Sequence, residues 1–179
     1  MDYQAFCEWV QRDGTQPAFV ARYPFAGIDR VVPEWVISGE SDVLFEPEWH
    51  IRCNSARWVF ADSNVRAVIL GPRRWSLHSG MFSTLTHLEA VWIPASLGRI
   101  DAGAFRGCDS LTDVFYEGTA PEWDKIHVVE HFDRVTSTGM GARSTQWRVP
   151  LEGNEVLHRA VIHLGCSRPT LATEEADPK

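Results

Sequence analysis

The chain has no long hydrophobic run and no recognisable export signal, and each absence narrows the class of protein. No stretch of 18 or more apolar residues occurs, so we expect no membrane span. The N-terminus MDYQAFCEWVQRDG has no cationic start followed by an apolar run, so it does not resemble a secretory signal peptide. The missing signal favours a cytoplasmic location.

Cysteines and basic clusters are also scarce. Cys7, Cys53, Cys108 and Cys166 are far apart, and none belongs to a C-x-x-C pair. Without a secretory signal, this favours reduced thiols over a disulfide framework. Asp and Glu number 24 against 17 Lys and Arg, giving a formal net charge of -7. A nucleic-acid partner is therefore not expected, because binding a phosphate backbone needs clustered basic residues.

The chain does contain an internal repeat. The segments VRAVILG (65–71), LEAVWIP (88–94) and LTDVFYE (111–117) share their apolar spacing at an offset of 23 residues. The same offset aligns Gly80 with Gly103 and Phe82 with Phe105. This period falls within the range of about 20–29 residues that is typical of leucine-rich repeats.

The L-x-x-L-x-L spacing predicts the direction of each side chain. Nine residues are expected to point inward and stack on their counterparts: Val65, Val68, Leu70, Leu88, Val91, Ile93, Leu111, Val114 and Tyr116. Gly80 and Gly103 are expected in tight bends, and Phe82 and Phe105 in the interior. Cys108 aligns with Leu85, so we predict a small buried core residue there.

Three segments resemble the BspA-like leucine-rich repeat family. LEAVWIPASLGRIDAGAFRGCDSL resembles its repeat, VFYEGTAPEWDKIHV its exit segment, and VLHRAVIHL (156–164) its closing strand. The resemblance is strongest over 88–128, weaker over 65–87 and 156–164, and does not extend to about 1–40. It implies a repeat fold and a binding role. Because members are often extracellular, it leaves a cell-surface or secreted location open.

We therefore predict an α/β, β-dominated fold: a short right-handed leucine-rich repeat solenoid with a parallel sheet and an N-terminal helical cap. Tyr3, Phe6, Cys7 and Val10 form one apolar helix face, with Asp2 as N-cap and Gly14 just past the end. The expected segments are a capping segment (1–41), the solenoid (42–128), an inserted loop (129–153), a closing strand (154–166) and a disordered tail (167–179).

The residues between the inward positions suggest a function. Ile69, Trp92 and Phe115 would form an apolar stripe across strands about 4.8 Å apart. We predict a non-catalytic module that binds another protein through this stripe, with flanking Arg66, Glu89, Thr112 and Asp113. Alternatively, the N-terminal segment or the 129–153 insertion folds over the stripe. The sequence leaves both interpretations open and does not indicate the oligomeric state.

Two other functional classes were considered. His127-Val128-Val129-Glu130-His131 matches the H-x-x-E-H pattern of zinc hydrolases, with Glu152 or Glu155 as a third ligand. Our prediction places it in a strand, where the two histidines would lie about 13 Å apart, so we expect no metal. No other catalytic or cofactor motif occurs, and we predict no cofactor and no enzyme. A small acidic inhibitor is the third class, using acidic residues near the exit segment: Glu117, Glu122, Asp124 and Glu130.

Overall fold

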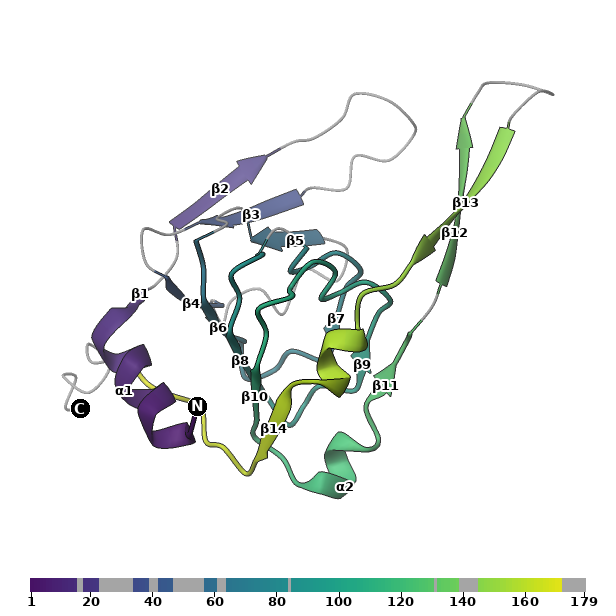
Figure 1. The fold of residues 1–179 in the computed structure, drawn as a ribbon. Helices are drawn as coiled ribbons and strands as arrows, with labels where there is room; N and C mark the ends of the chain where they lie inside the picture. Colours follow the sequence, from purple (N-terminus) through teal and green to yellow (C-terminus); the bar gives the residue numbers. More distant parts are fainter. Residues whose placement is uncertain are drawn as a thin grey trace.

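A computed structural model describes residues 1–15, 18–22, 34–38, 42–46, 57–60, 64–83, 85–130, 132–138 and 145–171. The described part combines an N-terminal helix with sheets whose strands are mostly parallel (Figure 1). The α/β class and the N-terminal helix predicted from the sequence are confirmed.

The largest sheet has six strands, and every neighbouring pair is parallel. Its order is β1 (Gly14–Thr15), β4 (Val43–Phe45), β6 (Ala67–Ile69), β8 (Ala90–Ile93), β10 (Asp113–Tyr116) and β14 (Val161–Leu164). Val68 pairs with Val91, and Val91 pairs with Val114. The 23-residue offset seen in the sequence is therefore the register of the three central strands.

A second parallel sheet contains the short strands β7 (Ser76–Leu77), β9 (Arg99–Ile100) and β11 (His127–Val128). Gly80 and Gly103 follow β7 and β9 with φ angles of 74° and 71°, a conformation that favours glycine. Phe82 and Phe105 stack with ring centroids 4.9 Å apart. These bends and aromatic contacts lie where the repeat alignment predicts them.

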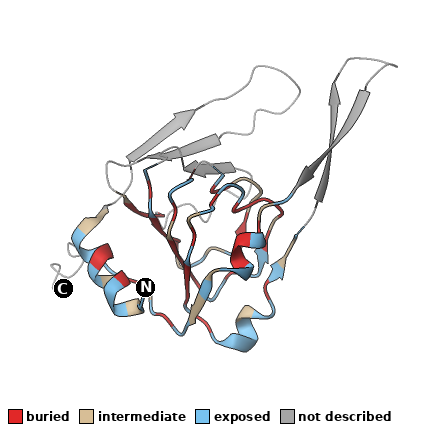
Figure 2. Cartoon of the chain, viewed as in Figure 1, coloured by how far each residue is buried: buried red, intermediate tan, exposed pale blue. Residues whose placement is uncertain are grey.

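The main core joins residues of both sheets. All nine predicted inward residues are buried, in one cluster with Leu77, Phe82, Ile100 and Phe105. Figure 2 shows buried residues running along the strands of the large sheet. Cys108 belongs to this cluster, its Sγ donates to the Phe82 carbonyl at 3.2 Å, and burial raises its pKa to about 12. The prediction that Cys108 is a core residue is confirmed.

A buried asparagine joins the last part of the fold to the preceding turns. The Asn154 side-chain amide donates to the carbonyls of Asp101 (3.0 Å) and Val129 (2.9 Å), and its oxygen accepts from the Phe105 N–H (3.3 Å). Asn154 precedes the short helix η2 (Glu155–His158), which leads into β14. The other short helix, α2 (Ala120–Trp123), lies between β10 and β11.

The remaining strands form two small sheets, one of which pairs strands of the predicted capping segment (1–41) with a strand of the predicted solenoid (42–128). β2 (Ala18–Arg22), β3 (Glu34–Ser38) and β5 (Arg57–Phe60) form one of them, in the order β2-β3-β5. β12 (Phe132–Thr138) and β13 (Thr145–Leu151) form an antiparallel hairpin. The predicted 129–153 loop is thus partly a hairpin, and FDRVTST and TQWRVPL contain the Val, Thr and aromatic residues that favour strands. Gly139-Met140-Gly141 lies outside the described residues.

The chain end differs from the predicted disordered tail. Residues 167–171 are described, and Leu171 is buried in a cluster with Phe45, next to Gly14. An apolar side chain that packs in this way holds a terminal segment in place. Residues 172–179 of the predicted tail lie outside the described residues. In the part of the chain that the structure describes, no helix is long and apolar enough to cross a membrane.

Candidate functional site

Helix α1 (Tyr3–Asp13) has the limits that its sequence predicts. The Asp2 side chain accepts a hydrogen bond from the Ala5 N–H at 2.8 Å, and the helix ends at Gly14. A Cβ at Gly14 would overlap the Val10 carbonyl and lie 2.9 Å from both Leu171 and Phe45. Glycine is therefore required here by close packing. Phe6 and Val10 are buried as expected, and Trp9 adds a third buried side chain that the predicted face omitted.

Helix α1 covers the stripe that the sequence marked as a binding surface. Ile69, Trp92 and Phe115 are fully buried, at 0% exposure, in a cluster with Phe6, Trp9 and Val10. The Phe6 ring stacks on Phe115 with centroids 4.2 Å apart and planes 14° apart. The expectation of an open aromatic surface is wrong, and the alternative of a covering N-terminal segment is confirmed (Figure 1).

The C-terminal segment contributes to this cover, which the sequence analysis did not foresee. Cys166 and Leu171 belong to the same buried cluster as the stripe. The Trp92 Nε1–H donates to the Cys166 carbonyl at 2.9 Å, which satisfies the buried indole. The continuous apolar runs AVI and AVWI could have indicated this burial, because parallel strands that are buried on both faces have uninterrupted apolar sequences.

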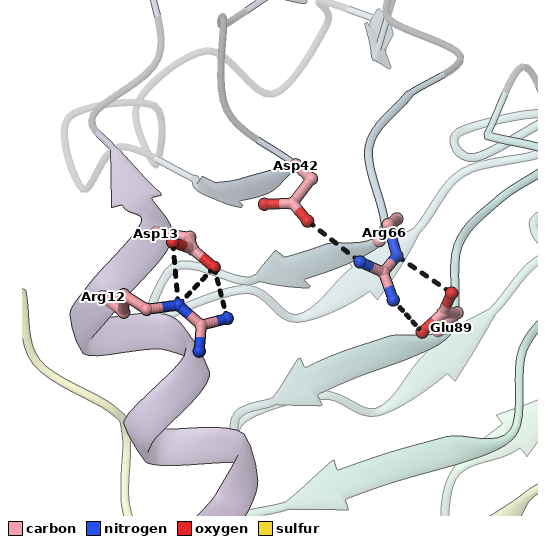
Figure 3. A network of polar contacts seen from close by, with 5 residues as sticks. All are labelled: Arg12, Asp13, Asp42, Arg66 and Glu89. Carbon is pink, nitrogen blue, oxygen red and sulfur yellow. Dashed lines mark hydrogen bonds and ion pairs between the residues drawn. The ribbon is translucent and has the colours of Figure 1, made fainter.

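The flanking residues that the sequence named have different environments. Arg66, Glu89 and Thr112 are not buried and line the entry ends of β6, β8 and β10. The Arg66 guanidinium donates to both Glu89 oxygens at 2.9 Å and reaches Asp42 at 3.3 Å (Figure 3). It also lies 5.1 Å from the centre of the Trp9 ring. The hydrogen bond to Glu89 raises the Arg66 pKa. Arg66 thus links neighbouring strands to α1.

A second ion pair, between Arg12 and Asp13, lies at the end of α1, with 2.7 Å between Nη2 and Oδ2 (Figure 3). Arg12 is largely exposed, and solvent screens an exposed pair of this kind so that it stabilises the fold little. These charges contribute little to the position of α1. Burial of the apolar cluster beneath the helix supplies most of the free energy that keeps it on the sheet.

Asp113 is a buried anchor, not the flanking contact residue that the sequence predicted. Its carboxylate accepts from the Met1 amino group (2.9 Å) and Thr112 Oγ1 (2.7 Å), and it lies 2.8 Å from His163 Nε2. Burial opposes ionisation, but these hydrogen bonds outweigh it and lower the Asp113 pKa. The His163 ring also stacks on Phe115 at 4.5 Å. Asp113 therefore connects β10 and β14 with Met1, two residues before α1.

The H-x-x-E-H residues do not form a helical metal motif. His127 lies in strand β11 with Nδ1 3.0 Å from Arg99 Nη1, and Glu130 Oε1 lies 3.1 Å from His158 Nε2. His131 lies outside the described residues, and Glu152 and Glu155 are exposed. Among the residues that the structure describes, no three His, Cys, Asp or Glu side chains gather as a metal site would require.

Two of the acidic residues proposed for an inhibitor accept hydrogen bonds within the fold. The Glu117 carboxylate accepts from the Ala95 N–H at 2.9 Å. The Glu122 carboxylate accepts from the N–H and the hydroxyl of Thr119, both at 2.8 Å, and completes a capping box for α2. Asp124 and Glu130 are exposed. Glu117 and Glu122 thus have structural roles that explain their presence without a basic partner.

Edge strand β14 is the surface that the sequence analysis missed. It pairs with β10, and it ends the order of the six-stranded sheet. Val161 is 56% exposed and Leu164 is 44% exposed, two of the four large apolar residues exposed in the described part. The available signal was the sequence VIHL, an apolar closing strand without a charged residue that would protect an edge.

Comparison of the chain with protein-family models, with curated proteins and with solved structures found no match. Any function must therefore be inferred from the geometry of this chain itself.

Proposed function

We propose that this protein is a non-catalytic interaction module that binds an extended segment of another protein along edge strand β14. The observation that carries the proposal is an apolar sheet edge, formed by Val161 and Leu164, with which no further strand of the described residues pairs. Sheet edges in natural proteins are usually blocked by lysine, proline, a bulge or a covering segment. The β14 sequence VIHL contains none of these blocking residues.

The proposed scaffold is a short right-handed solenoid of the BspA-like leucine-rich repeat type. Three features support it: the 23-residue register of β6, β8 and β10, the second parallel sheet, and the matching glycine bends. In such a scaffold the strands stack into a rigid sheet whose ends expose an edge. The β1 end of this sheet lies next to α1, whereas the opposite end is β14.

The backbone of β14 is suited to pairing with a further strand. The Val161 N–H donates to the Thr112 carbonyl at 2.8 Å, toward β10. Because backbone groups alternate along a strand, those of Ile162 and Leu164 turn away from β10 and offer about four hydrogen bonds to a partner. Val161 and Leu164 lie on opposite faces of the sheet, so a partner strand with apolar residues on both faces fits best.

These contacts imply a weak complex unless the partner reaches beyond the edge. About four hydrogen bonds at about 1 kcal/mol each, and two half-buried apolar side chains at about 1 kcal/mol each, give roughly 6 kcal/mol before the cost of association. Because association itself costs at least about 4 kcal/mol, the edge contacts alone give an affinity weaker than millimolar, and contacts beyond the edge must supply the rest.

The test compares charged substitutions at the edge with a matched control. The partner is first captured with the full chain and purified. Its affinity is then measured by titration against the variants Val161→Lys, Leu164→Lys and Trp75→Lys. Trp75 is 57% exposed and directly precedes β7 in another part of the chain, so its replacement adds the same charge at an equally exposed apolar residue. We expect both β14 variants to weaken binding at least about tenfold, while Trp75→Lys leaves it unchanged.

Hydrogen exchange gives an independent readout of strand pairing. Binding should slow exchange of the Ile162 and Leu164 amides, which face away from β10. Equal affinity of all three variants, with no added protection of these two amides, would show that the edge is not the binding site. If the chain dimerises alone and the β14 variants are monomeric, the occupant of the edge is a second copy of the chain.

A further inference from the structure

Two cysteines from opposite ends of the chain lie in the contact between α1 and the segment after β14. Cys7 is on α1, one turn after Tyr3, and Cys166 follows β14 by two residues. The Tyr3 hydroxyl donates to the carbonyl of Ser167, the residue next to Cys166. The Cys166 carbonyl accepts a hydrogen bond from the Trp92 indole N–H. Helix α1 and the 166–167 segment therefore lie against one another on the same side of the sheet.

The electrostatics of this contact agree with the geometry. Burial raises the Cys166 pKa, and the charge of a Cys7 thiolate raises it further. Burial is also the largest effect that raises the Tyr3 pKa. A hydrogen bond with Cys7 and the charges of Cys7 and Cys166 raise it further. These shifts agree with the hydrogen bond from Tyr3 to Ser167, which brings the helix of Cys7 to the segment of Cys166.

We propose that Cys7 and Cys166 are a redox-active pair whose disulfide locks α1 over the sheet. This inference does not depend on partner binding at β14. Because α1 covers Ile69, Trp92 and Phe115, a bond from the helix to the segment after β14 would hold the cover closed. Reduction would leave the same cover held by packing and hydrogen bonds alone.

The oxidant in this proposal is a small disulfide such as oxidised glutathione. Cys7 is only partly buried, so its thiolate attacks one sulfur of the oxidant first and releases one glutathione thiolate. The Cys166 thiolate then attacks the Cys7 sulfur and releases the second. The protein loses two protons and two electrons, and the oxidised glutathione is reduced to two thiols.

The other cysteines serve as internal comparisons. Cys108 is buried in the main core with its pKa raised to about 12, so it should not react. Cys53 lies outside the described residues and must be tested as an alternative partner. The variants Cys7→Ser, Cys166→Ser and Cys53→Ser separate the possible pairings.

The experiment equilibrates the folded full chain in glutathione redox buffers, alkylates free thiols, and maps disulfides by mass spectrometry without reduction. We expect a Cys7–Cys166 peptide in the wild type and in Cys53→Ser, and its loss in the other two variants. The oxidised wild type should also unfold at a higher temperature than the reduced form, with no such difference in Cys7→Ser.

Three results would overturn the proposal: a disulfide that involves Cys53, glutathione that stays on Cys7 without transfer to Cys166, or free thiols at both positions in the most oxidising buffer. The wild-type map decides between these outcomes even if a serine variant fails to fold.

Discussion

Replacing Phe6 by alanine tests whether α1 is an integral part of the fold. Phe6 is fully buried and stacks on Phe115 with centroids 4.2 Å apart, and it also contacts Trp9 edge-on at 6.5 Å. Truncation of a buried phenylalanine to alanine costs about 3–5 kcal/mol through lost transfer energy and the cavity that remains. We expect Phe6→Ala to lower the free energy of unfolding by about 4 kcal/mol, a large share of the roughly 5–15 kcal/mol of a typical domain.

The control variant is Gln11→Ala on the exposed side of the same helix. It leaves the packing untouched and should change stability by less than about 0.5 kcal/mol. Urea unfolding of both variants, followed by far-ultraviolet circular dichroism and by tryptophan fluorescence, measures the difference. Fluorescence sums the emission of eight tryptophans, including Trp92, which α1 covers. If Phe6→Ala and Gln11→Ala lose equally little stability, the helix does not pack on the sheet as described, and the reasoning fails.

A second outcome for Phe6→Ala would be informative about cooperativity. If α1 detaches while the rest of the fold persists, the two probes will give separate transitions, and Trp92 will become accessible to an aqueous quencher before the sheet unfolds. Coincident transitions would show that the helix and the sheet unfold as one unit.

Four further substitutions probe other contacts. Asn154→Ala removes three hydrogen bonds and leaves buried backbone groups unpaired, so chemical denaturation should show a loss of about 3 kcal/mol; no loss would contradict the buried network. Gly14→Ala introduces a Cβ into a filled space and should lower stability by about 2 kcal/mol. Gly165→Ala places its Cβ in open space and should cost only about 1 kcal/mol, because its φ of 69° disfavours alanine. The reverse order of melting temperatures would refute this packing. The folded-state pKa of Asp113 is lowered, so its contribution to stability is complete above its unfolded pKa of about 3.9 and is lost as pH falls through the lower folded value. Urea midpoints measured down to acid pH should therefore fall less steeply for Asp113→Asn than for the wild type, and parallel curves would argue against this assignment.

Local periodicity was sufficient to predict the interior of the main core. The residues between Val65 and Tyr116 repeat their apolar spacing every 23 residues, and the structure pairs them at that offset. The limits of α1 were also readable, because an N-cap such as Asp2 and a terminal Gly14 act within one helical turn. Such features depend on contacts between residues that are near one another in sequence or related by one repeat.

Only the tertiary structure decided which surfaces are covered. The alternation of side chains correctly placed Trp92 and Phe115 on the face opposite the main core, but it cannot distinguish water from a helix on that face. The answer came from contacts across the whole chain, such as Phe6 on Phe115 and Trp92 with Cys166. Contacts between residues so far apart leave no periodic pattern in the sequence. For the same physical reason, the burial of Leu171, the hydrogen bond of Tyr3 to Ser167 and the exposed edge of β14 became visible only in the folded chain.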